Sequence, residues 1–276
     1  MSDQYAVFGN PIAQSKSPQI HRLFADQYGL DISYDRLQVA EGKFEQAART
    51  FFEKGGRGLN VTTPFKDDAY QFANQLTPRA RRAGAVNTLA VQEGGEVLGD
   101  TTDGVGVVRD ICRNLKWNMR GKRVLILGAG GAVRGVLASV LEESPAVLVI
   151  ANRTAAKAQS LAKGFIDLGP IEGIGLDNFG SREFDLIING TSIHLAGGSL
   201  QLPETIFGKD CCCYDMAYAS ELTPFLRWVK PLCAESSDGL GMLVEQAAES
   251  FSLWTQKRPE TASVIEVITE LVRPDS

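Results

Sequence analysis

The stretch Arg123-Val-Leu-Ile-Leu-Gly-Ala-Gly-Gly-Ala132 decides the fold. It begins with an apolar run of strand length, and its glycine turn leads into a helical pattern that continues through Leu141. Glycine lets the chain turn tightly and lets a pyrophosphate approach the backbone, while the helix N-terminus offers N–H groups and a positive dipole end. The third glycine of Gly-x-Gly-x-x-Gly would fall on Val133, so a tight turn without a ligand is the alternative.

The end of the next strand indicates which dinucleotide would bind. NAD-binding folds usually place Asp or Glu there for the ribose hydroxyls. This chain has Asn152-Arg153-Thr154, followed by Lys157. Arg153 can bind a 2′-phosphate through two N–H groups, and Lys157 lies on the same side at i+4. The pattern favours NADP over NAD, with a solvated basic pair at a helix start as the alternative.

Short apolar runs alternate with helical patterns along the whole chain, which is typical of α/β architecture. A hairpin is predicted from Val86–Val91 and Glu96–Leu98 around Gly94-Gly95. The other predicted strands are Tyr5–Phe8, Ser33–Val39, Gly58–Val61, Arg123–Leu127, Ala146–Ile150, Asp185–Ile188 and Cys211–Tyr214. Predicted helices begin near Pro18 and after Gly130, and others cover Gly42–Phe52, Thr154–Phe165, Leu240–Thr255 and Thr261–Leu271.

Composition excludes several classes of protein. The 28 basic and 33 acidic residues among 276 give a formal net charge of -5, which argues against a nucleic-acid surface. Apolar runs are too short to span a membrane, and the N-terminus lacks signal-peptide features, so we expect a cytoplasmic protein. The spacing of His21, His194 and the five cysteines predicts neither a metal site nor a disulfide framework. No Gly-x-Ser-x-Gly turn supports a serine hydrolase.

Several phrases, in order along the chain, point to one family. The first ones are Ser15-Lys-Ser17-Pro18, Asn60-Val-Thr62-Thr-Pro-Phe-Lys66, Gly84-Ala-Val-Asn87-Thr88 and Gly99-Asp-Thr-Thr-Asp103-Gly104. Gly128–Ala132, Asn152–Thr154, Tyr214-Asp-Met216-Ala-Tyr218 and Asp238-Gly239 through Gln246 follow. Each is weak alone, but the ordered set, which covers essentially the whole chain, resembles the shikimate dehydrogenase family. Members of that family reduce 3-dehydroshikimate to shikimate with NADPH.

The resemblance implies two α/β domains with the active site in the cleft between them. Residues 1–103 and 242–276 would form a substrate-binding and catalytic domain with a mainly parallel sheet. Residues 104–241 would form a Rossmann domain that binds NADP. It implies a small-molecule partner, with no nucleic acid, membrane or metal, and leaves both a monomer and a homodimer open.

The resemblance also assigns roles to residues. Lys66 and Asp103 correspond to the catalytic pair, and Ser15 and Ser17 to the hydroxyls that hold the substrate carboxylate. The groups around the ring hydroxyls would be Thr62, Asn87, Asp103, Tyr218 and Gln246. The cofactor contacts would be Gly128, Ala129, Gly130, Gly131, Ala132, Asn152, Arg153, Thr154 and Lys157, with Thr191, Met216 and Gly239 near the nicotinamide.

Without the resemblance, these residues have ordinary explanations. Lys66 would be a surface lysine at a helix start, and Asp103 a helix cap. The sequence also departs from the family pattern at Thr101, where Asn is usual, and at Ile193-His194, where smaller residues are usual. Two alternatives remain: a paralogue acting on quinate or an aminated shikimate analogue, and a non-catalytic ligand sensor. The intact Lys66 and Asp103 argue against the sensor.

Overall fold

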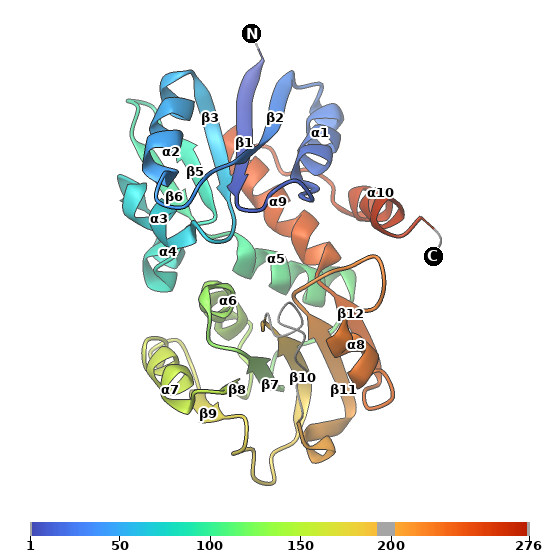
Figure 1. Cartoon of the computed structure of the whole chain (residues 1–276). Coiled ribbons are helices and arrows are strands. Elements are labelled where there is room, and N and C mark those ends of the chain that lie inside the picture. The colour runs from blue at the N-terminus through green and yellow to red at the C-terminus, as the bar shows by residue number, and fades with distance from the viewer. Residues whose placement is uncertain (1, 192–201, 275–276) are drawn as a thin grey trace. The chain divides into compact units, whose positions relative to one another are not determined.

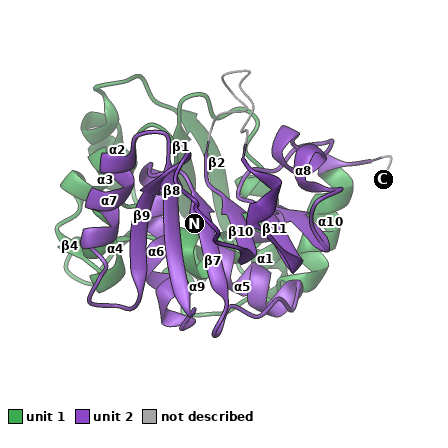
Figure 2. Ribbon diagram, turned by 90° about the horizontal axis from the view of Figure 1, so that it is seen from below, with its two compact units in different colours: residues 1–106, 243–271 green, residues 107–242, 272–276 purple. Residues whose placement is uncertain are grey.

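The computed structural model describes residues 2–191 and 202–274, which form two compact units (Figures 1 and 2). Unit 1 comprises Met1–Gly106 and Leu243–Leu271, and unit 2 comprises Val107–Met242 and Val272–Ser276. The chain passes between the units inside helices α5 (Asp103–Arg109) and α9 (Leu240–Thr255), and again at the end of α10 (Ala262–Val272). We predicted that the chain beyond Leu271 belongs to the first domain, but the structure groups it with unit 2. The physical reason is that Arg273 donates to the Ala219 carbonyl and pairs with Asp238.

Unit 1 is built on a six-stranded mixed sheet with the order β2-β1-β3-β5-β6-β4. Strand β5 runs antiparallel to both of its neighbours, and the other pairs are parallel. The strands are β1 Asp3–Gly9, β2 Ile32–Gln38, β3 Gly56–Val61, β4 Gln75–Leu76, β5 Thr88–Val91 and β6 Val97–Asp100. The helices are α1 Ser17–Tyr28, α2 Phe44–Glu53, α3 Lys66–Phe72, α4 Pro78–Ala83 and α10 Ala262–Val272, together with α9.

Local sequence explains the elements of unit 1. The predicted hairpin forms between β5 and β6, and Gly94 and Gly95 adopt φ values of 103° and 88° in its turn. Such values suit glycine and strain other residues. Helix α2 packs Phe44 and Ala48 into a core with residues of β1 and β3, such as Phe8 and Leu59. This core fixes the ends of the strands from which the site residues project.

Unit 2 is built on a six-stranded, fully parallel sheet with the order β12-β11-β10-β7-β8-β9. Read from β9, the order along the chain is 3-2-1-4-5-6, which is the Rossmann order. The predicted fold class is therefore confirmed. The strands are β7 Arg123–Leu127, β8 Val147–Asn152, β9 Ile171–Gly175, β10 Phe184–Asn189, β11 Phe207–Asp215 and β12 Glu235–Asp238. The helices are α6 Gly131–Glu142, α7 Ala155–Lys163 and α8 Pro224–Val229, with a 3₁₀ turn at Glu204–Ile206.

Both faces of the unit 2 sheet are covered. Along β7, Val124 and Ile126 belong to one apolar cluster, and Leu125 and Leu127 belong to another. This alternation is the period of two expected for a strand buried on both faces. Helix α5 continues into a π-helical turn at Asp110–Asn114, which the sequence did not predict. No helix among the described residues is long and apolar enough to cross a membrane.

Candidate active site

The predicted catalytic pair meets in unit 1. Lys66 is the first residue of α3, and Asp103 is the first residue of α5. Lys66 Nζ donates to Asp103 Oδ2 over 2.5 Å, with the two side chains 23% and 11% exposed. The carboxylate of Asp103 therefore lies at a helix N-terminus, where the partial positive charge attracts anions. An ammonium has three N–H donors, so Lys66 can bind Asp103 and another acceptor at once.

Asn87 binds the second oxygen of the Asp103 carboxylate, the one that Lys66 does not contact. The backbone N–H of Thr102 donates to Asn87 Oδ1 over 2.9 Å. A backbone N–H can only donate, so the amide oxygen must face Thr102 and the amide nitrogen must face away from it. That nitrogen donates to Asp103 Oδ1 over 2.9 Å. Both oxygens of Asp103 therefore accept hydrogen bonds, one from Lys66 and one from Asn87.

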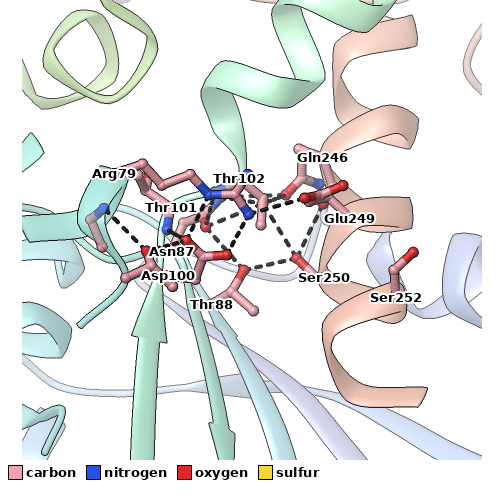
Figure 3. A network of polar contacts seen from close by, with 12 residues as sticks. Arg79, Asn87, Thr88, Asp100, Thr101, Thr102, Gln246, Glu249, Ser250 and Ser252 are labelled. Atoms are coloured by element: carbon pink, nitrogen blue, oxygen red, sulfur yellow. Dashed lines mark hydrogen bonds and ion pairs between the residues drawn. The ribbon is translucent and has the colours of Figure 1, made fainter. Parts of the chain in front are cut away.

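Gln246 reaches this cluster from α9 (Figure 3). Its Oε1 accepts from Thr102 Oγ1 over 3.4 Å and from Asn87 Nδ2 over 3.5 Å. One turn further along α9, Ser250 Oγ lies 2.8 Å from Thr88 Oγ1 and 3.3 Å from Thr102 Oγ1. The structure thus brings Lys66, Asp103, Asn87 and Gln246 together, and it adds buried hydroxyl groups that sequence reasoning did not single out.

The two predicted carboxylate-binding serines lie at the start of α1. Ser15 Oγ donates to Ser17 Oγ over 3.1 Å, and the backbone N–H of Ser17 donates to Ser15 Oγ over 3.3 Å. Pro18 stands within the first turn of the helix, where its missing N–H costs nothing. The pair thus presents hydroxyl groups beside a helix N-terminus, which suits a carboxylate.

A chain of hydrogen bonds runs from the serine pair toward the catalytic pair. Burial raises the pKa of Tyr34 well above its usual value, against a hydrogen bond with Ser17, so the phenol stays protonated. Its hydroxyl donates to Asn60 Oδ1 over 2.7 Å. Asn60 Nδ2 donates to Thr88 Oγ1 over 3.2 Å, and that hydroxyl donates to Asn87 Oδ1 over 3.0 Å. The signal that sequence reasoning missed was Asn60, a polar residue within a buried strand.

Thr62 follows β3 and opens the turn into α3. Its carbonyl accepts from the backbone N–H of Phe65 over 3.0 Å, and its own N–H donates to the carbonyl of Phe8 over 2.9 Å. A Cβ atom on Gly9 would lie 2.6 Å from the Thr62 methyl group, so glycine is needed at that position. Thr62 is therefore held between the end of β1 and Phe65, the residue that precedes Lys66.

In unit 2, the glycine turn has the geometry that a pyrophosphate needs. Gly128 adopts φ 106°, and a Cβ atom there would lie 3.2 Å from the carbonyl oxygen of Gly190. Gly130 is the N-cap of α6 and Gly131 its first residue, while Ala132 is exposed. Added Cβ atoms on Gly130 or Gly131 would meet no described atom within 4 Å. The open backbone and the helix N-terminus fit a bound dinucleotide.

The predicted 2′-phosphate contacts lie at the end of β8. Asn152 is the last residue of the strand, and its Nδ2 donates to the carbonyl of Thr154, the N-cap of α7, over 3.1 Å. Arg153 and Lys157 are exposed, as cations that bind a solvated phosphate should be. The residues at this strand end therefore fit NADP.

The residues predicted near the nicotinamide gather around a buried polar pair. Asn189 Nδ2 donates to Asp215 Oδ1 over 3.0 Å, and Asn189 Oδ1 accepts from Thr191 Oγ1 over 2.7 Å. The backbone N–H of Met216 donates to the Asn189 carbonyl over 2.9 Å. A Cβ atom on Gly239 would lie 2.3 Å from the carbonyl oxygen of Met216, so the two loops touch. Asn189 and Asp215, which the sequence did not indicate, hold these loops together.

Tyr218 belongs to unit 2. Burial, with a smaller effect from Asp238, raises the pKa of its phenol above the usual 10, so this hydroxyl remains a donor.

The family departure at Ile193-His194 lies outside the described residues. All five cysteines are free, and no group of three metal-binding side chains occurs within residues 2–191 and 202–274.

Three family models match the chain. They are the shikimate dehydrogenase substrate binding domain over residues 7–89, shikimate / quinate 5-dehydrogenase over residues 110–195, and the shikimate 5′-dehydrogenase C-terminal domain over residues 239–269.

Relatives and solved structures that match nearly the whole chain point to the same family as these models. A shikimate dehydrogenase (NADP(+)) from Cellvibrio japonicus is 56% identical over 99% of this chain and 98% of its own. A protein of the same name from Alkalilimnicola ehrlichii is 52% identical over 96% and 98%. The crystal structure of an Ael1 enzyme from Pseudomonas putida has a TM-score of 0.91 at 40% identity, covering 97% of this chain and 98% of its own. Shikimate 5-dehydrogenase from Thermus thermophilus, solved with NADP(H) and shikimate, has a TM-score of 0.83 at 30% identity, covering 96% and 97%. The chain belongs to the shikimate dehydrogenase family.

Proposed function

We propose that this chain catalyses the reversible NADPH-dependent reduction of 3-dehydroshikimate to shikimate. The observation that carries the proposal is the Lys66–Asp103 pair, whose nitrogen and oxygen lie 2.5 Å apart. The proposal is supported by the matching relatives, which are named shikimate dehydrogenases (NADP(+)).

Reducing a ketone requires a donor to its oxygen as negative charge develops there. The reduced nicotinamide supplies the hydride when it is bound. Lys66 donates a hydrogen bond and then a proton to the ketone oxygen. Asp103 keeps the Lys66 side chain oriented, and in the reverse direction Lys66 accepts the hydroxyl proton while it stays bonded to Asp103. Asn87 holds the carboxylate oxygen that Lys66 does not use.

The remaining roles follow the chemistry of the ligands. Ser15 and Ser17 bind the substrate carboxylate, and neutral polar groups bind the ring hydroxyls: Thr62, Asn87, Tyr218 and Gln246. The glycine turn at Gly128–Ala132 holds the pyrophosphate. Asn152, Arg153, Thr154 and Lys157 hold the 2′-phosphate, while Thr191, Met216 and Gly239 lie at the nicotinamide. The predicted cytoplasmic location and the possibility of a homodimer stay predictions.

The test is nicotinamide absorbance with shikimate and with quinate, each in the presence of NADP or NAD. We expect fast reduction of NADP with shikimate and much slower turnover in the other three mixtures. Comparable efficiency with quinate would favour the paralogue, an alternative that the family name shikimate / quinate 5-dehydrogenase keeps open. Shikimate binding without turnover would favour the ligand sensor.

A further inference from the structure

A buried carboxylate lies shortly before Asp103 in the sequence of unit 1. Asp100, the last residue of β6, has a side chain that is 2% exposed. Arg79 on α4 binds both of its oxygens: Nε donates to Oδ1 over 2.8 Å, and a terminal nitrogen pairs with Oδ2. Thr77 Oγ1 and the backbone N–H of Thr101 also donate to Oδ1, over 2.6 and 2.8 Å. A buried charge needs such partners, because an unpaired one is strongly destabilising.

Asp100 connects this ion pair to the catalytic cluster. It precedes Asp103 by three residues, and its carbonyl accepts from the backbone N–H of Asn87 over 3.0 Å. Asn87 then binds Thr102 and Asp103 through its side chain. A shift of Asp100 would therefore move Asn87, which holds one oxygen of the Asp103 carboxylate.

The same guanidinium also binds α9 (Figure 3). A terminal nitrogen of Arg79 lies 3.0 Å from Glu249 Oε1. Glu249 stands three residues after Gln246, so the two side chains share one side of the helix. Arg79 thus spans three elements: α4, the end of β6 and α9. Burial alone would lower the pKa of Arg79, but its bonds with Asp100 and Glu249 raise it overall, so the cation is permanent.

We propose that Arg79 is a positioning residue for the reaction, which acts through Asp100 and Glu249 to hold Asp103 and Gln246 in place beside Lys66. The proposal rests on the function proposed above. It predicts that full turnover requires Arg79, although this residue binds Asp100 and Glu249 and acts on the proposed reacting groups only through them.

Arg79→Lys is the first test, because lysine keeps the charge but cannot form two parallel N–H bonds to one carboxylate. We expect kcat to fall about 10- to 100-fold, as for a misplacement of reacting groups by a fraction of an ångström to one ångström. The Kd for NADP should stay within about twofold, since the proposed cofactor residues lie in unit 2. Arg79→Ala should lose more activity, and added methylguanidinium should restore part of its kcat by refilling the site.

Arg123→Lys is the matched control. Arg123 also binds one carboxylate through two nitrogens, Nε and a terminal nitrogen to Asp185 over 3.2 and 2.8 Å, but this pair lies in unit 2 and contacts neither Asp100 nor Glu249 in the described structure. We expect this variant to lower the melting temperature and leave kcat unchanged. If Arg79→Lys only lowered the melting temperature by a similar amount and kept its kcat, a purely structural role would replace the proposal.

The parent enzyme and Lys66→Ala separate this proposal from the proposed function. A parent that oxidises shikimate, with a Lys66→Ala variant that is nearly inactive, supports the function. Unchanged kcat in Arg79→Lys would then overturn the positioning role alone. A parent without this activity would overturn both.

Discussion

The substrate site of unit 1 and the cofactor site of unit 2 are built in different ways. In unit 1, the side chains of Lys66, Asp103, Asn87 and Gln246 take part in one hydrogen-bonded cluster, in which Asn87 and Asp103 are buried. In unit 2, the glycine turn offers backbone N–H groups, and Arg153, which follows the next strand β8, is an exposed cation. Groups that share partners respond together to substitution, whereas separate groups respond independently. We therefore expect changes in unit 1 to alter the rate and changes in unit 2 to alter cofactor affinity.

Lys66→Ala tests the strongest form of this comparison. Loss of a general acid–base group typically lowers the rate by about 100- to 10,000-fold. We expect kcat to fall in that range while the Kd for NADP, measured by titration, changes little. Lys54→Ala, which removes an exposed lysine from the same unit, is the control and should keep full activity. A Lys66→Ala enzyme with most of its turnover would reduce Lys66 to a binding group.

Substrate choice tests how closely the serine pair is adapted to shikimate. Quinate carries an additional hydroxyl on the carbon that bears the carboxylate, and Ser15 and Ser17 already bond to one another there. A hydroxyl without room or partner costs about 1–3 kcal/mol, or about 10- to 200-fold in kcat/KM. We expect the parent enzyme to prefer shikimate over quinate by this ratio of kcat/KM values, and we expect Ser15→Ala to reduce the ratio. Equal kcat/KM values for the two substrates would remove the serine pair from the explanation.

Arg153→Ala should act on the cofactor alone. Loss of a charge-assisted hydrogen bond costs about 1.5–3 kcal/mol, so the KM for NADPH should rise about 10- to 150-fold. Kinetics with NADH should change little, because NADH lacks the 2′-phosphate. Arg182→Ala, at a partly exposed arginine paired with Glu172, serves as the control for loss of a surface cation in unit 2. A similar rise for NADH would show that Arg153 supports the fold of the loop instead of reading the phosphate.

How much of this structure can be predicted from the sequence depends on how far apart along the chain the interacting residues lie. Helix α9 occupies the predicted residues Leu240–Thr255, and β7 occupies Arg123–Leu127, because local periodicity and a buried apolar run define them. The bonds of Arg79 with Asp100 and Glu249 join residues 21 and 170 positions apart, and no local pattern reports them. The hydrogen bonds of Asn60 with Tyr34 and Thr88, which lie between the serine pair and the catalytic pair, also join residues far apart in the chain. Short elements such as α4 and α8 escaped prediction because they contain few turns of periodic sequence.

The smallest expected effect concerns an ion pair that lies away from both sites. Asp185 binds Arg123 at the start of β7, whereas the glycine turn follows the end of that strand. The hydrogen bonds from Arg123 hold the pKa of Asp185 below its usual 3.8, against a partial opposing effect of burial. A carboxyl group with a lowered pKa in the folded state stabilises the protein above its unfolded pKa, and this stabilisation is lost as the pH falls through the folded pKa.

Asp185→Asn should therefore lower the free energy of unfolding at neutral pH by about 1 kcal/mol or less, because the Arg123 side chain is 41% exposed. The difference from the parent should shrink toward zero as the pH falls below the usual pKa of 3.8. Urea unfolding from neutral pH down to about pH 3 measures it. The Kd for NADP should not change, since Arg123 stands at the opposite end of β7 from Gly128. A difference that grows on acidification would contradict the lowered pKa, and weaker NADP binding would contradict the independence of charges in unit 2.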